Sequence, residues 1–156
     1  MKFALAFTIL SIVASTIASH LPTKCDPISF AVKAVCSGSD LDNDSIKKVD
    51  AHPHVFTVGG DDGKNIILTL NKDCTLKDQD GRGIYLNPDT GDFGNVDPWG
   101  EQDPTKGFTI KNDYLYYNYK EGWRACPSAP NVYSLAKNDC IGGTDIRLQT
   151  FEVKPL

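Results

Sequence analysis

Beyond its first nineteen residues, this chain carries no helical pattern that lasts three turns, and short β-forming runs alternate with turn residues instead. The runs are rich in Val, Ile, Thr, Phe and Tyr, and Gly, Asp, Asn or Pro separates them, as in antiparallel strands joined by tight turns. They lie at 29–35, 54–58, 65–70, 83–86, 107–110, 114–117, 123–125, 132–135 and 145–151. Many short strands in one small domain predict an all-β fold, a single compact barrel or sandwich.

The runs also group loosely into three units, near residues 28–60, 64–100 and 106–153, which share a layout but little residue identity. Because threefold β repeats are the mark of a β-trefoil, a trefoil-like arrangement is slightly favoured among the barrels and sandwiches. The longest expected loop runs from 89 to 106 and contains Trp99 between two Asp-Pro pairs. No linker or low-complexity segment divides the chain, which predicts a single domain.

Residues 1–19 have the order of a secretory signal peptide. Lys2 supplies the positive start, an apolar run follows over 3–14, and small residues at 15–19 suit a signal peptidase. The apolar run is too short to span a bilayer and no second run follows, so we expect no membrane anchor. Cleavage at this point leaves 20–156 as one all-β domain that is secreted and works outside the cytosol.

The charge of the chain argues against two classes of partner. The formal net charge is −4, and the basic residues are scattered rather than gathered in a stripe. A chain of this sign has no electrostatic attraction to nucleic acid or to anionic lipid. We therefore expect neither nucleic acid nor membrane as a partner.

The cysteines all follow the leader, and an oxidising compartment predicts that they pair. An odd number leaves one thiol over, either buried and inert or bridged to another molecule. The strand expected at 29–35 holds Cys25 and Cys36 about 30 Å apart, whereas a bridge needs Cα atoms within about 7 Å. Cys126 and Cys140 flank a turn and a returning strand, so we predict a bridge between them. The five cysteines are Cys25, Cys36, Cys74, Cys126 and Cys140.

Aromatic residues are concentrated between 114 and 123. If 114–119 is a strand, Leu115, Tyr117 and Tyr119 face one way, and Tyr114 and Tyr116 face the other. One set packs inward, and the other is free to present flat rings to a sugar. Tyr114, Tyr116 and Trp99 are therefore candidate glycan contacts, with ordinary β propensity and core filling as the alternative.

No catalytic or metal-binding constellation stands out. The acidic alternation at 40–44 resembles a calcium loop, but Ser45 and Ala51 stand where an EF-hand needs Gly and Glu. The pair of histidines in 52–54 gives too few ligands for zinc. There is no Gly-x-Ser-x-Gly elbow and no protease-type cysteine motif. We expect no enzyme, cofactor or metal site, and the alternative is a small hydrolase whose acid pair the sequence does not reveal.

Asn43, in Asn-Asp-Ser, is an acceptor for N-glycosylation.

Several short motifs carry a resemblance to a known family. They are 28–39, 55–60, Cys-Thr-Leu-Lys-Asp-Gln-Asp-Gly-Arg-Gly-Ile-Tyr at 74–85, Gly-Phe-Thr-Ile-Lys-Asn-Asp-Tyr-Leu at 107–115, Trp-Arg-Ala-Cys-Pro at 123–127, Val-Tyr-Ser-Leu at 132–135, and Cys140. Together they resemble the cysteine-bearing domain of fungal cell-wall proteins. The similarity extends to the wall mannoproteins with internal repeats and to the phialide-type proteins, some of which are immunoglobulin-E-binding antigens.

The resemblance implies a secreted, glycosylated wall protein with a structural or surface role and no catalysis. Two departures bear on its attachment: the Gln-rich repeats are absent, and so is the late cysteine that follows the equivalent of Cys140. Attachment through the odd cysteine and simple release both stay open. The first hypothesis is a non-enzymatic cell-wall or surface protein that contacts wall polysaccharide. The alternative is a secreted, trefoil-type inhibitor or effector that presents the 89–106 loop to a foreign protein.

Overall fold

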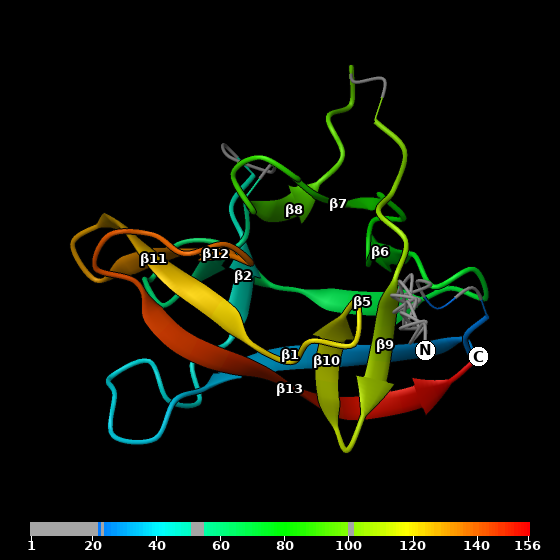
Figure 1. Ribbon diagram of the computed structural model, residues 1–156, viewed down its shortest axis with the longest axis horizontal. Coiled ribbons are helices and arrows are strands. Elements are labelled where there is room, and N and C mark those ends of the chain that lie inside the picture. Colours follow the sequence, from blue (N-terminus) through cyan, green and yellow to red (C-terminus); the bar gives the residue numbers. More distant parts are fainter. Residues whose placement is uncertain (1–21, 23, 51–54, 100–101) are drawn as a thin grey trace, which may run out of the picture.

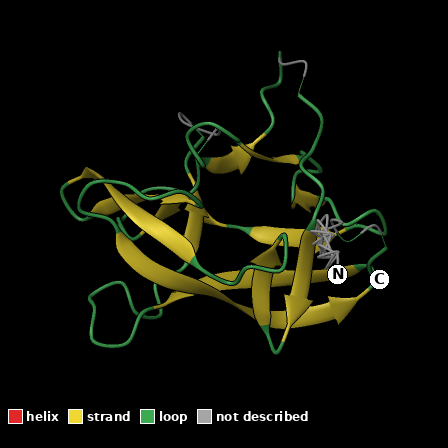
Figure 2. Ribbon diagram, viewed as in Figure 1, coloured by secondary structure: helices red, strands yellow, loops and turns green. Residues whose placement is uncertain are grey.

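The computed structural model describes residues 22, 24–50, 55–99 and 102–156, and every regular element in them is a β-strand (Figures 1 and 2). The all-β prediction is confirmed, and the expected leader at 1–19 lies outside the described residues. The strands are β1 (Ile28–Val35), β2 (Ile46–Lys48), β3 (Thr57–Val58), β4 (Lys64–Asn65), β5 (Ile67–Leu70), β6 (Leu76–Asp78), β7 (Ile84–Leu86), β8 (Phe93–Asn95), β9 (Phe108–Lys111), β10 (Tyr114–Tyr117), β11 (Trp123–Ala129), β12 (Val132–Ala136) and β13 (Thr144–Pro155).

Most strands belong to one antiparallel sheet, in the order β4-β2-β3-β12-β11-β13-β1-β5-β6. The long strand β13 organises it. Its first part pairs with β11, while β1 pairs along it from Val35 opposite Arg147 to Ile28 opposite Pro155. Strand β10 also pairs with β13 and carries β9 on its other side. The β1–β13 register shifts once beside Glu152, whose φ of 51° is the left-handed geometry of a β-bulge.

Strands β7 and β8 form a separate two-stranded sheet that lies over the large one (Figure 1). Isolated bridges join its ends to the main sheet, Lys77 to Gly83 and Asp92 to Ala136. The described strands do not close into a barrel, and the body is sandwich-like. The trefoil-like arrangement stays a prediction.

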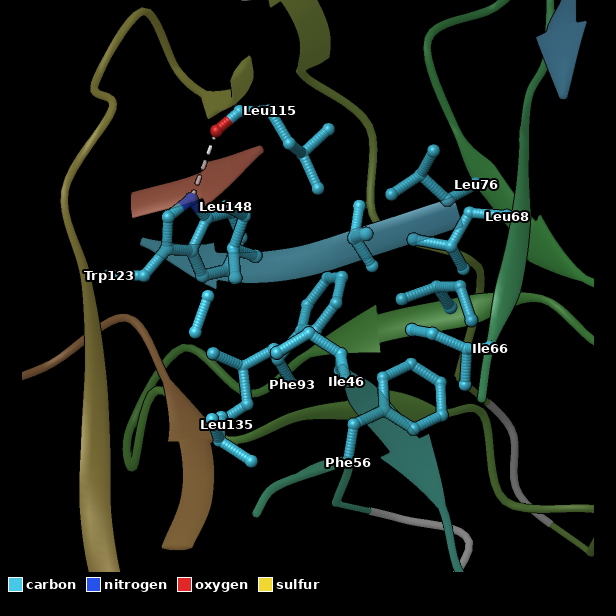
Figure 3. Close-up of a cluster of buried hydrophobic side chains, with 14 of the residues drawn as sticks. Ile46, Phe56, Ile66, Leu68, Leu76, Phe93, Leu115, Trp123, Leu135 and Leu148 are labelled. Atoms are coloured by element: carbon cyan, nitrogen blue, oxygen red, sulfur yellow. Dashed lines mark hydrogen bonds between the residues drawn. The ribbon is translucent and has the colours of Figure 1, made fainter. Parts of the chain in front are cut away.

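Phe93 of β8 ties the small sheet to the core (Figure 3). Its ring lies edge-on to Phe56, Phe108 and Trp123, with centroid distances of 5.5, 5.8 and 5.0 Å. The Phe56 N–H donates to the Phe93 carbonyl at 2.8 Å, and the buried Trp123 Nε1 donates to the Leu115 carbonyl at 3.0 Å. Contacts of Phe93 with three other buried aromatic rings therefore hold the hairpin against the large sheet.

The expected runs fall on the longer strands, although β11 and β13 extend beyond them, to Ala129 and Pro155. The strands that the sequence did not indicate are short. The sequence missed β2, β6 and β8, which have only three residues each. The loop expected from 89 to 106 is therefore interrupted by β8, because Phe93 is drawn into the core. Strand β3 begins only at Thr57, since the preceding Phe56 bonds to Phe93 instead. Isolated three-residue strands leave too little alternation for sequence periodicity to detect.

Two disulfides close the described chain. The predicted bridge between Cys126 and Cys140 is confirmed, with Cα atoms 5.9 Å apart. The second joins Cys25 to Cys74, with Cα atoms 5.3 Å apart, so Cys25 and Cys36 are indeed not paired with each other. Cys36 is the free, half-buried thiol. Bridges of this kind persist in an oxidising compartment.

Candidate functional site

Trp99 is the most exposed aromatic side chain of the described residues, with 92% of its surface open to solvent. It lies on the segment between β8 and β9, which projects away from the body of the molecule (Figure 1). Its backbone N–H donates to Asp97 Oδ1 at 3.0 Å, and the Asp97 N–H donates to Gln102 Oε1 at 3.4 Å. Hydrogen bonds to the Asp97 and Gln102 side chains therefore fix the backbone of the turn that carries Trp99.

A polar cavity of about 210 Å³ opens at the base of this loop. Amide, carboxylate and phenol groups dominate its walls. Such groups donate and accept hydrogen bonds in several directions, as recognition of a multiply hydroxylated ligand requires. The lining residues are Val55, Tyr85, Asn87, Asp92, Asn95, Asp97 and Gln102.

The β7–β8 turn sets the position of two of these residues. Asn87 Oδ1 accepts the N–H groups of Asp89 and Thr90, at 2.9 and 3.2 Å, and the Asn87 N–H donates to the Asp92 carbonyl. Gly91 completes the turn with a φ of 79°, and a Cβ there would lie 2.5 Å from the Asn138 nitrogen. The turn therefore needs glycine at this position, both for its backbone angle and for its closeness to the neighbouring loop.

Asn95 joins the cavity to a buried ion pair. Its Nδ2 donates to Asp78 Oδ2 at 2.9 Å, and the same oxygen accepts from Lys48 Nζ at 2.7 Å. Lys48 Nζ also reaches Asp80 Oδ2, 2.9 Å away. Asn95 is only 2% exposed, and its Oδ1 has no hydrogen-bond donor among the described residues. The cavity wall therefore contains a buried acceptor that lacks a partner.

The ion pair keeps both groups charged. Burial alone raises the pKa of Asp78, but hydrogen bonds from Lys48, the Arg82 N–H and Asn95 outweigh it and hold the pKa below its ordinary value. Burial likewise lowers the pKa of Lys48, but Asp78 and Asp80 prevail and raise it above the ordinary value. The Lys48–Asp78 ion pair therefore stays charged, and it holds Asn95 in place at the wall of the cavity.

A second, larger cavity of about 510 Å³ lies beside the first, and Val55 lines both. Its walls are mainly apolar, with three hydroxyls and one carboxylate. No local pattern in the sequence indicates this cavity, because its residues come from segments that are far apart along the chain. They are Val49, Val55, Thr57, Gly59, Gly60, Asp62, Ser128, Ala129, Val132 and Ser134.

The two candidate tyrosines face outward, as the alternation predicts. Leu115 is fully buried and Tyr117 packs against the core, while Tyr114 and Tyr116 lie on the other face of β10. The strand ends at Tyr117, so the prediction that Tyr119 continues the inward face is wrong: it lies in the following turn and is 59% exposed.

Neighbouring charges already engage this tyrosine pair. The Arg147 guanidinium lies 4.4 Å from the centre of the Tyr114 ring and pairs with Glu121 at 3.4 Å. Burial and the Glu121 carboxylate raise the pKa of Tyr116. Strand β10 and the Trp99 loop lie on opposite sides of the molecule (Figure 1). The structure therefore does not bring the three candidate aromatics together.

The remaining candidates lie apart from the cavities. Asn43 is exposed, with a φ of 70°, and its Oδ1 accepts from Lys33 Nζ at 2.9 Å. Cys36 donates its N–H to Asp42 Oδ1 at 2.8 Å. The described residues contain no group of three or more His, Cys, Asp or Glu that could hold a metal, and the histidines of 52–54 lie outside them.

Fold and site define a disulfide-tied, antiparallel β domain with a polar cavity beneath an exposed tryptophan. No helix in the described part of the chain is long and apolar enough to cross a membrane. No family model, curated protein or solved structure matches this chain.

Proposed function

We propose that this chain is a non-enzymatic, exported glycoprotein of a fungal cell wall or cell surface, and that it contacts wall polysaccharide. The observation that carries the proposal is Trp99, 92% exposed on a loop whose base is a cavity of amide and carboxylate groups. A flat ring offers a stacking surface to a sugar, and the polar groups beside it offer partners to its hydroxyls. Binding residues are disproportionately found on loops that a rigid scaffold positions.

Two further observations support this proposal. The disulfides suit an oxidising compartment, as expected of an exported chain. The Asn43 side chain is exposed and available to carry a glycan. The motifs that resemble fungal wall proteins agree with the proposal of an exported wall glycoprotein.

Retention on insoluble polysaccharide tests the proposal. The purified protein is incubated with β-glucan, chitin and mannan, and the bound fraction is measured for the wild type and for Trp99→Ala. We expect retention on at least one polymer and its loss in Trp99→Ala. Tyr119→Ala is the matched control, since it removes an exposed aromatic side chain away from the cavity. Absence of retention, or equal retention of all three proteins, contradicts the proposal.

One observation favours the alternative, a secreted inhibitor or effector. Ile141 is fully exposed next to Cys140, whose bridge to Cys126 and backbone contact with Gly143 hold the turn. A rigid apolar tip of this kind fits a pocket on a foreign protein. Inhibition of a secreted protease that disappears in Ile141→Ser, with no retention on polysaccharide, supports this alternative.

A further inference from the structure

The two cavities adjoin along Val55, which lines both. The polar one, at about 210 Å³, is smaller than the roughly 300–1,000 Å³ typical of ligand pockets, whereas the apolar one lies within that range at about 510 Å³. Ligand sites usually combine apolar walls with a few placed polar groups. The larger cavity supplies the apolar walls with a few polar groups, and the smaller cavity adds more polar groups beside it. We call the two cavities together the Val55 groove.

The charged residues that line this groove are all aspartates: Asp62, Asp92 and Asp97. Among the described residues none of the three takes part in an ion pair. Asp92 accepts one hydrogen bond from Thr90 through Oδ2, and Asp97 accepts one from the Trp99 N–H through Oδ1. Each carboxylate therefore keeps acceptor capacity for an occupant.

Two cations bond to backbone carbonyls of the segments that form the groove. Lys47 Nζ donates to the Gly60 carbonyl at 2.6 Å, and an Arg82 Nη donates to the Val96 carbonyl at 3.1 Å. Neither side chain lines a cavity. The charge that faces an occupant is therefore negative, which repels acidic sugars and attracts a cationic one.

Asn95 supplies an observation independent of the charges. It lines the polar cavity, is 2% exposed, and its Nδ2 is turned to Asp78. Its Oδ1 has no donor among the described groups, and a buried acceptor without a partner is costly. Because this oxygen has almost no accessible surface, an occupant relieves the cost only if its N–H or O–H group packs against Asn95 and the amide side chain shifts to meet it.

We propose that the Val55 groove binds a linear chain of amine-bearing sugars, with a protonated amine at Asp92 and Asp97 and the apolar ring faces along the valine wall. This inference rests on the proposed polysaccharide contact and names its ligand class. An ammonium donates charge-assisted hydrogen bonds, which are about twice as strong as neutral ones, so an amine is preferred to a hydroxyl at this position.

Three oligosaccharides of equal length test the preference by titration calorimetry: a glucosamine hexamer, an N-acetylglucosamine hexamer and a glucose hexamer. We expect the glucosamine hexamer to bind about tenfold more tightly than the other two, the size of one charged hydrogen bond. Added salt lowers its affinity, because the contact is partly electrostatic. A glucosamine dimer binds more weakly than the hexamer, because it does not span both cavities.

Variants separate this inference from the proposed function. In Asp92→Asn/Asp97→Asn the preference for the amine disappears while binding of the glucose hexamer remains. The matched control, Asp26→Asn, removes an exposed carboxylate outside the groove and leaves all affinities unchanged. Equal binding of the three hexamers, or a preference that survives the double substitution, overturns the inference and leaves the proposed function standing. Binding of none of these hexamers and of none of the wall polymers overturns both.

Discussion

Replacing Asp78 by alanine is expected to be among the most destabilising substitutions in this protein. The Asp78 side chain is 0% exposed and accepts four hydrogen bonds. They come from Lys48 Nζ, Asn95 Nδ2 and the N–H groups of Asp80 and Arg82, at 2.7, 2.9, 3.0 and 2.9 Å. Alanine removes the acceptor from all four donors and leaves the ammonium of Lys48, 6% exposed, without its buried partner.

The magnitude follows from the burial of the pair. Removing one partner of a buried ion pair costs about 3–5 kcal/mol, because the remaining charge is not compensated. Asp80 still contacts Lys48 at 2.9 Å, which reduces this cost, while the orphaned amide and backbone N–H groups increase it. We therefore expect a loss of about 4 kcal/mol, a large part of the roughly 5–15 kcal/mol that stabilises a typical domain.

Urea unfolding followed by tryptophan fluorescence measures this loss, with the disulfides intact in every variant. The control is Asp80→Ala: its carboxylate is 61% exposed and also contacts Lys48, and the expected cost is about 0–1 kcal/mol. A second variant, Lys48→Met/Asp78→Leu, is expected to recover most of the stability, because it leaves no buried charge. If Asp78→Ala costs no more than Asp80→Ala, the reasoning from burial is refuted.

The same pair predicts a pH dependence at both ends of the scale. The pKa of Asp78 is lower in the folded protein than in the unfolded chain, so its contribution is present above about pH 4 and is lost as the pH falls through the folded value. The pKa of Lys48 is raised by Asp78 and Asp80 against the opposing effect of burial, so its contribution is lost as the pH rises beyond its ordinary 10.5. Lys48→Met/Asp78→Leu is expected to flatten both limbs of the curve.

Three further predictions concern other parts of the fold. Gly91→Ala is expected to lower stability by about 1–3 kcal/mol, because φ is 79° and the new Cβ meets the Asn138 nitrogen; thermal unfolding measures it, and an unchanged midpoint contradicts it. Cys36→Ser is expected to keep both intrachain bridges and to abolish any disulfide-linked dimer or mixed disulfide, as non-reducing mass spectrometry reports; loss of an intrachain bridge speaks against this assignment. Burial lowers the pKa of Lys137 to about 8, so the unfolded chain binds this proton more tightly than the folded protein does. The free energy of unfolding is therefore expected to rise between about pH 8 and 10.5, and this rise is expected to disappear in Lys137→Met. An equal rise in both proteins refutes the shift.

The sequence predicted the class of fold and local orientation, since both follow from short-range patterns. Turn residues between β-forming runs placed the longer strands, and period-two alternation placed Leu115 inward and Tyr114 outward. The distance argument against pairing Cys25 with Cys36 also succeeded, because a strand has a fixed rise per residue. Each of these arguments spans about ten residues or fewer.

What the sequence did not predict depends on contacts between distant segments. Asp78 lies in Asp-Gln-Asp-Gly, a pattern typical of a turn, and only the fold brings it to Lys48 and Asn95, 30 and 17 positions away. The cavities are likewise lined from several segments, so no local spacing marks them. The one available signal was Trp99 beside Asp97, an aromatic residue and a carboxylate together in a loop rich in proline.

The small sheet explains how a short hairpin presents a rigid site. Phe93 and Asn95 are two apart on β8, so both point toward the interior, where they are 0% and 2% exposed. Phe93 inserts among aromatic rings, and Asn95 bonds to the charged pair. One apolar and one polar anchor therefore fix the strand from which the cavity wall and the Trp99 loop begin. Because a two-stranded hairpin alone is only marginally stable, the geometry of the site depends on these two core contacts.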